Sequence, residues 1–198
     1  MCNTYRISRK SGASGLVRQV NEAAAKLVSD LVRKSDPGVV RADGHVEVMR
    51  WGFRREFNPV INNARSDKLE GGMWCEAFHE RRCAIPMSLF YEWGPGTGGR
   101  KQAYEIRDPE SEWLWAAGIW EQHPELGPCY TMVTTAASPL MSPIHDRMPA
   151  LLHPDVMQDW LAGGRWDFQP FTGSLVVAPC DSPLVKRRNG GVRQGELL

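Results

Sequence analysis

The stretch CAIPMSLFYEW, Cys83–Trp93, carries the clearest strand pattern in the chain. Its run of apolar and aromatic residues predicts a strand that is interrupted at Pro86 and then resumes. A turn rich in glycine, GPGTGGRK (94–101), follows it. Three more strand candidates come next, and together they predict a curved, largely antiparallel sheet. They are QAYEIR (102–107), EWLWAAGIW (112–120) and CYTMVTT (129–135).

Helical patterns flank these strands without a regular alternation of strand and helix. Apolar residues at helical spacing from Leu16 to Leu31 predict an amphipathic helix that ends at SDPG (35–38). Weaker helical patterns occupy 66–82 and 153–163, and SLVVAP (174–179) predicts a last strand. The chain is therefore predicted to be one α+β domain over 1–188, with a flexible tail over 189–198.

Composition limits the classes of function. The 198 residues, 42% of them apolar, suit one globular domain, and no apolar run is long enough to span a bilayer. The start of the chain lacks the pattern of a secretory signal, so we expect a cytoplasmic protein. Five cysteines without a CxxC pair argue against a disulfide framework and a zinc site. A net charge of +1 leaves a local basic groove possible.

The opening, MCNTYRI, places a cysteine directly behind the initiator methionine. Aminopeptidases remove a methionine that precedes a small side chain, and Cys2 would then carry an α-amino group beside its thiol. An α-amino group titrates near about 7.7–8, so part of it is neutral at pH 7. A nearby arginine or protonated histidine would favour the thiolate. Cys2 is thus a candidate bifunctional nucleophile.

The motif MRWGF contains Trp51 at the end of a predicted strand. Its ring could be a buried aromatic next to a turn glycine. It could also stack on a nucleobase, since every base offers a π-face.

The motif INNARSD follows a strand-like segment. On a strand, Asn63 and Arg65 point to the same side, where an amide and a guanidinium can orient a polar substrate and hold an anion. An ordinary polar turn is the alternative interpretation.

The motif FYEWG places Glu92 inside an aromatic strand, on the side shared with Phe90. A carboxylate in such surroundings is partly desolvated and suits general acid–base work. A glutamate on the solvent face of the strand is the alternative.

The motif SPIHDRMPAL brackets His145 and Arg147 between Pro143 and Pro149. The prolines restrict the backbone and help to hold both side chains. Histidine moves protons near neutral pH, and arginine can hold phosphate. A purely structural histidine is the alternative.

These motifs, MCN, MRWGF, NNARSD, RRCAIPMSLFYEW and HDRMPAL, occur in an order that resembles the SOS-response-associated peptidase family, over residues 2 to about 188. The resemblance implies a β-barrel-like core and a groove for single-stranded DNA. It also implies covalent capture of abasic sites, in which the amine and thiol of Cys2 form a thiazolidine with the sugar aldehyde. The family's site residues map onto Cys2, Asn63, Glu92 and His145 for the chemistry, and onto Trp51, Arg65 and Arg147 for DNA.

The resemblance further implies an enzyme of the DNA damage response, with lyase and autoproteolytic peptidase activity among its possible reactions. We expect a monomer near the nucleoid that needs no cofactor, no metal and no membrane. Three alternatives stay open. An amidohydrolase could use the amine of Cys2 as the base for its thiol. A peptidase could act on its own leader, and a non-enzymatic protein could bind single-stranded DNA without covalent capture.

Overall fold

Five strands close into a barrel in the computed structural model, which describes residues 2–12, 14–171 and 173–184. Around the barrel β12 pairs with β4, β4 with β3, β3 with β8, β8 with β11, and β11 returns to β12. Only the β12–β4 pair among these is parallel. The predicted α+β fold with an antiparallel, barrel-like sheet is confirmed. The barrel strands are β3 (Pro37–Ala42), β4 (His45–Trp51), β8 (Arg82–Met87), β11 (Leu114–His123) and β12 (Gly127–Ala136).

The strand predicted over Cys83–Trp93 divides at Ser88 rather than at Pro86. Pro86 lies within β8 opposite Trp115, and every residue of β8 is buried. The Ser88 N–H donates to the Arg6 carbonyl over 2.7 Å, and this bond turns the chain out of the barrel. The continuation, β9 (Leu89–Pro95), belongs to a second sheet.

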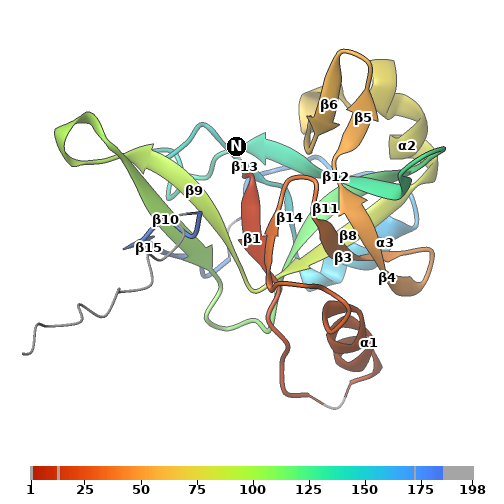
Figure 1. Cartoon of the computed structure of the whole chain (residues 1–198), viewed down its shortest axis with the longest axis horizontal. Helices are drawn as coiled ribbons and strands as arrows, with labels where there is room; N and C mark the ends of the chain where they lie inside the picture. The colour runs from red at the N-terminus through yellow and green to blue at the C-terminus, as the bar shows by residue number, and fades with distance from the viewer. Residues whose placement is uncertain (1, 13, 172, 185–198) are drawn as a thin grey trace, which may run out of the picture.

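The second sheet has the order β15-β10-β9-β1-β2, and its pairs are antiparallel. Figure 1 shows β1 between the β9–β10 arm and the barrel, which places the start of the described chain where the two sheets meet. Its remaining strands are β1 (Thr4–Arg6), β2 (Leu31–Arg33), β10 (Lys101–Arg107) and β15 (Val176–Cys180).

The helices are shorter than the sequence pattern predicts. The first, α1 (Gly15–Ala24), is capped by Ser14, whose hydroxyl oxygen accepts from the Val17 N–H, and it ends well before Leu31. Leu31 instead enters β2 opposite Arg6, because strand pairing with β1 overrides the helical spacing. The pattern over 66–82 forms two 3-10 turns and one short helix. The other helical elements are η1 (Ser66–Lys68), η2 (Gly72–Trp74), η3 (Thr97–Gly99), α2 (Cys75–Glu80) and α3 (Pro154–Leu161).

Short strands extend the barrel sheet, two of them on β12 and one on β11. One of them runs parallel to β12 and another antiparallel to it, on opposite sides. A hairpin stands apart from both large sheets, above β12 in Figure 1. These strands are β5 (Phe53–Arg55), β6 (Asn58–Ile61), β7 (Asn63–Arg65), β13 (Arg147–Pro149) and β14 (Leu151–Leu152). The tail predicted over 189–198 lies outside the described residues.

Three aromatic side chains fix β1 against the barrel. Tyr5 meets the edge of Trp51 at 5.1 Å between ring centroids, and Trp51 lies parallel to Tyr130 at 6.2 Å. The Trp51 indole N–H donates to the Asn62 carbonyl over 2.8 Å. The structure corrects the expectation that Trp51 stacks on a base, because its side chain is 0% exposed. Its ring is a packing element that supports the segment leading into β7.

The hydroxyls of Tyr5 and Tyr130 share a buried hydrogen bond of 2.6 Å directly over Gly38. A Cβ at Gly38 would lie 2.1 Å from one hydroxyl oxygen and 2.4 Å from the other. We therefore expect Gly38→Ala to lower the free energy of unfolding by about 1–3 kcal/mol through overpacking. Urea denaturation measures this loss, and Gly15→Ala, whose Cβ meets nothing within 4 Å, is the control. Equal stability of the two variants would contradict the predicted clash.

Candidate active site

Cys2 lies just before β1 and is 0% exposed. Its carbonyl oxygen accepts hydrogen bonds from two neighbouring amides, Asn63 Nδ2 at 2.8 Å and Asn62 Nδ2 at 3.3 Å. Its thiol donates to the Thr4 carbonyl over 3.6 Å. Two side-chain donors on one carbonyl hold the backbone of Cys2 in a single place.

Asn63 begins β7, where it lies opposite Met132 of β12. Its amide nitrogen is used by Cys2, while its Oδ1 is buried and has no hydrogen-bond partner among the described residues. A buried amide oxygen without a donor is costly in a folded protein. It can accept a hydrogen bond from a donor that arrives with a substrate or forms on Cys2.

Asn62 is a site residue to which the sequence reasoning gave no role of its own. Its amide contacts Cys2 and also donates to Asn3 Oδ1 over 2.9 Å. Alternation along a strand would send adjacent asparagines to opposite faces. Asn62 precedes β7, so this rule does not apply, and both amides reach Cys2. The two adjacent asparagines in the sequence were the signal that could have identified Asn62 as a site residue.

Burial governs the thiol of Cys2. Burial raises the pKa of the Cys2 thiol to about 12, and the nearby charge of Glu92 adds to the rise. The expected effect of an arginine or histidine does not enter, because the groups that act on this pKa include neither and desolvation dominates. The thiol is neutral at pH 7, so it must lose its proton when it reacts as a nucleophile.

Glu92 is the carboxylate whose charge acts on the Cys2 thiol. It lies on β9, is 3% exposed, and its Oε1 accepts from the Trp93 N–H at 3.2 Å. Phe90, Tyr91 and Glu92 are all buried, so burial does not separate the two faces of this strand. The start of β1 runs beside β9, since Tyr5 lies opposite Phe90, and this pairing brings Cys2 toward Glu92.

His145 lies in the turn before β13. Its Nδ1 accepts from the Arg147 N–H at 3.0 Å and lies 2.8 Å from Asp146 Oδ1. The first contact uses the lone pair of Nδ1, whereas the second is a hydrogen bond only when Nδ1 carries a proton. The second becomes an ion pair when the ring is protonated. A backbone N–H and a carboxylate of the same turn thus both act on Nδ1 and orient the ring.

Two arginines meet across the end of β12. Arg65 on β7 lies opposite Thr134, and Arg147 on β13 lies opposite Ala136. Arg147 donates to the Thr134 carbonyl, and its Nε is buried with no hydrogen-bond partner in the described part of the chain. Burial, and then the charge of Arg65, lower the pKa of Arg147. This pair of cations favours an anion.

In the structure, the anion beside these two arginines is the carboxylate of Asp67. Its carboxylate takes two hydrogen bonds from Arg65, at 3.0 and 2.8 Å, and lies 3.9 Å from Arg147 Nη2. Hydrogen bonding by Arg65 lowers the pKa of Asp67 to about 2. The carboxylate stays charged at neutral pH and competes with any incoming anion.

The side chains from three separate motifs line one cleft of about 470 Å³. Trp51 and Glu92 do not line it, and Cys2 is joined to it through the amides of Asn62 and Asn63. The lining residues are Asn3, Asn58, Val60, Ile61, Asn62, Asn63, Arg65, His145, Asp146 and Arg147. The cleft therefore joins two arginines beside the carboxylate of Asp67, a histidine next to Asp146, and the amides that hold Cys2.

The described residues hold no group of three or more His, Cys, Asp and Glu that could bind a metal ion. All five cysteines are free thiols. Cys83 and Cys129 are buried and Cys180 is half-buried. No helix in the described ranges has the length and apolar character that crossing a membrane requires.

A sequence model of the family described as SOS response associated peptidase (SRAP) matches residues 4–184. The abasic site processing protein YoqW of Bacillus subtilis is 36% identical over 116 residues, 56% of this chain and 52% of YoqW. YobE of the same organism, also named an abasic site processing protein, is 33% identical over 76% of this chain and 74% of its own length. HMCES of Xenopus tropicalis, likewise named, is 32% identical over 59% of this chain and 45% of its own.

The matched segment thus spans about half of YoqW and of HMCES. Two crystal structures share the fold at low identity. A protein from Bordetella bronchiseptica has a TM-score of 0.75 at 21% identity, covering 91% of this chain and all of its own. One from Bacteroides thetaiotaomicron has a TM-score of 0.71 at 20% identity, covering 91% and 92%.

Proposed function

The chain belongs to the SOS response associated peptidase (SRAP) family, and from this membership we propose that it captures abasic sites in single-stranded DNA by a covalent bond to Cys2. Removal of Met1 frees the α-amino group of Cys2 beside its thiol. One observation carries the proposal: two amides hold the Cys2 carbonyl at the edge of a cleft with two arginines and a histidine. The names of the relatives YoqW, YobE and HMCES support DNA with abasic sites as the substrate.

The reaction uses both nucleophiles of one residue. In the ring-opened abasic sugar, C1′ is an aldehyde carbon. The Cys2 amine adds to C1′ and water leaves, which gives an imine. The thiol then adds to the same carbon, its proton passes to the nitrogen, and a five-membered thiazolidine closes with the net loss of one water. Ring closure is intramolecular and gains from proximity.

Proton transfer falls to Glu92 and His145 in this proposal. Because burial keeps the thiol neutral, its addition to the imine needs a base, and Glu92 is buried close enough to influence the Cys2 pKa. His145 lines the cleft and can donate a proton to the sugar oxygen released on ring opening. Asn63 fixes Cys2 and offers its unpaired Oδ1 to the amine.

Phosphate binding falls to Arg65 and Arg147, which contact the strand without reading its sequence. Arg65 has a side chain that is 56% exposed and can reach a phosphate directly, whereas Arg147 is 14% exposed and lines the inner wall. Such contacts release counterions, so binding should weaken as salt rises. One chain supplies every group the proposal needs, and a monomer is sufficient.

Asp67→Asn should tighten binding of single-stranded DNA roughly two- to fivefold, because exposed ion pairs are weak and the change frees Arg65 for a phosphate. The slope of log affinity against log salt concentration should become steeper by about one, because Arg65 would add one phosphate contact. Fluorescence anisotropy at several salt concentrations measures both. Asp155→Asn, the same charge change on an exposed side chain of α3, is the control. Equal gains in both variants would show only a net-charge effect.

The proposal is tested with an oligonucleotide carrying one abasic site, incubated with the protein and separated on a denaturing gel. A slow-migrating adduct with the abasic strand and none with the undamaged strand is expected. Salt-sensitive binding that ignores the abasic site, with no adduct, would indicate a non-covalent DNA binder. Release of ammonia from glutamine would indicate an amidohydrolase instead.

A further inference from the structure

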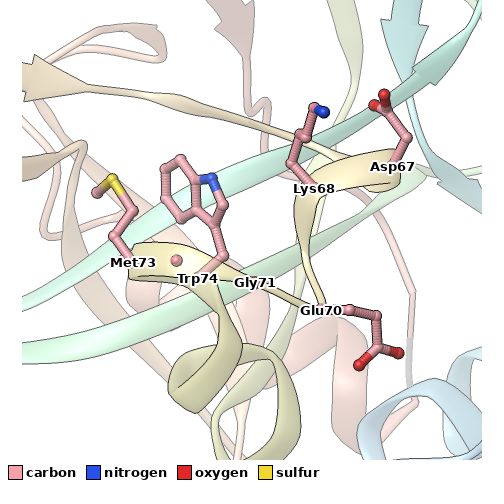
Figure 2. Close-up of a pocket in the computed structure, with 7 residues that line it drawn as sticks. Asp67, Lys68, Glu70, Gly71, Met73 and Trp74 are labelled. Atoms are coloured by element: carbon pink, nitrogen blue, oxygen red, sulfur yellow. The ribbon is translucent and has the colours of Figure 1, made fainter.

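A second cleft of about 460 Å³ adjoins the first. It is formed where η1 leads through Gly71 into η2, and Figure 2 shows the side chains around it. Asp67 lines this second cleft and is hydrogen-bonded to Arg65, which lines the first. The Arg65–Asp67 pair is therefore the border between the two clefts.

The second cleft has an aromatic wall next to a cation. In Figure 2 the side chains of Trp74, Met73 and Lys68 extend to the same side of the ribbon, and Glu70 extends to the other. Glu70 is paired with His79 over 3.1 Å. Asp67 lines the same cleft as Lys68, and its carboxylate is already paired with Arg65.

Trp74 is anchored and yet accessible. Its ring packs on the buried Phe53 at 5.7 Å between centroids, and the side chain is half-buried. Beside it, Gly71 and Gly72 have no neighbouring atom within 4 Å of where a Cβ would lie. Gly72 has φ +58, a conformation that favours glycine. The backbone here leaves open space next to a fixed indole.

We propose that Trp74 and Lys68 form a subsite for a nucleotide that flanks the abasic site. The nucleobase stacks on the Trp74 indole, and the Lys68 ammonium pairs with the adjoining phosphate. Stacking accepts any base, so the subsite adds affinity without sequence preference. The inference rests on the proposed binding of single-stranded DNA. In it, the DNA strand continues from Arg65 past Asp67 into the second cleft.

The test is a scan of the flanking bases. Each oligonucleotide carries an unreactive tetrahydrofuran at the lesion position, which sets the register, and a second one at each neighbouring position in turn. For the parent protein, loss of one particular flanking base should weaken binding by about 5- to 100-fold. For Trp74→Leu the affinity should already be reduced by a similar factor, and removal of that base should have no further effect.

Three variants keep the test decisive. Trp74→Phe retains a ring and should recover most of the affinity, whereas Lys68→Gln should reduce the salt slope by about one. Trp166→Leu removes another half-buried tryptophan that lies outside this cleft and should leave the base scan unchanged. The subsite would be overturned if Trp74→Leu gave the same base scan as the parent. Equal losses of affinity in the Trp74 and Trp166 variants would also overturn it.

The subsite can fail independently of covalent capture. Affinity for undamaged single-stranded DNA reports on Trp74 even if the parent forms no adduct. Conversely, Trp74→Leu could form the adduct normally at saturating DNA and also bind DNA with the affinity of the parent. That result would support covalent capture and contradict the subsite.

Discussion

Cys2→Ala is expected to form no adduct that survives denaturation, whereas the parent protein cross-links to abasic DNA. The variant keeps an N-terminal amine but has no sulfur to close the ring, so the chemistry stops at an imine that water reverses. A denaturing gel without reductant measures the loss. The fold should tolerate the change, because the carbonyl that Asn62 and Asn63 hold is retained.

Two controls separate the roles of nitrogen and sulfur. Borohydride reduces an imine to a stable amine, so Cys2→Ala should give an adduct only when the reductant is present. Cys75→Ala, which removes a half-buried thiol elsewhere, should behave like the parent. An adduct from Cys2→Ala in the absence of reductant, at the parental yield, would exclude the thiazolidine.

Glu92→Gln is expected to slow cross-linking by about 10²–10⁴-fold, the usual contribution of a general acid–base group. Glutamine fills the same buried space and still accepts from the Trp93 N–H, but it cannot take the proton of the thiol. Single-turnover rates from a quenched time course measure the effect. Because the Cys2 thiol is neutral near pH 7, hydroxide must then replace the carboxylate, and the rate of the variant should rise with pH toward 9 more steeply than that of the parent.

The control for Glu92 is Glu105→Gln on the neighbouring strand β10, where Glu105 lies opposite Tyr91. This half-buried carboxylate should be dispensable. A Glu92→Gln variant that is folded by urea denaturation and reacts within threefold of the parent would remove Glu92 from the chemistry.

Two barrel strands were predictable from the sequence because they are long and apolar, whereas the barrel itself was expected only from the family resemblance. EWLWAAGIW and CYTMVTT pair as β11 and β12, where expected. The end of the first helix was not predictable, since the same spacing of apolar residues serves a helix up to Ala24 and a strand from Leu31. β3 was missed because DPGVV resembles a helix stop, and only its pairing with β4 makes it a strand.

Part of the candidate site was predictable as a set of residues that come together, although their roles stay predictions. Asn63, Arg65, His145 and Arg147 do line one cleft. Three facts depended on tertiary structure: Trp51 is buried, the Cys2 thiol is desolvated, and Asp67 occupies the arginine pair. Local sequence cannot report these, because burial and ion pairing arise between segments that are distant in the chain.

The masses of the protein and of its adduct test covalent capture by Cys2 most directly. Protein purified from cells should have the intact mass of the chain without Met1. Its adduct should equal that mass plus the abasic oligonucleotide minus one water, with the DNA on the peptide that begins at Cys2. Complete retention of Met1, an acylated amino terminus, or attachment to any other residue would contradict capture by Cys2.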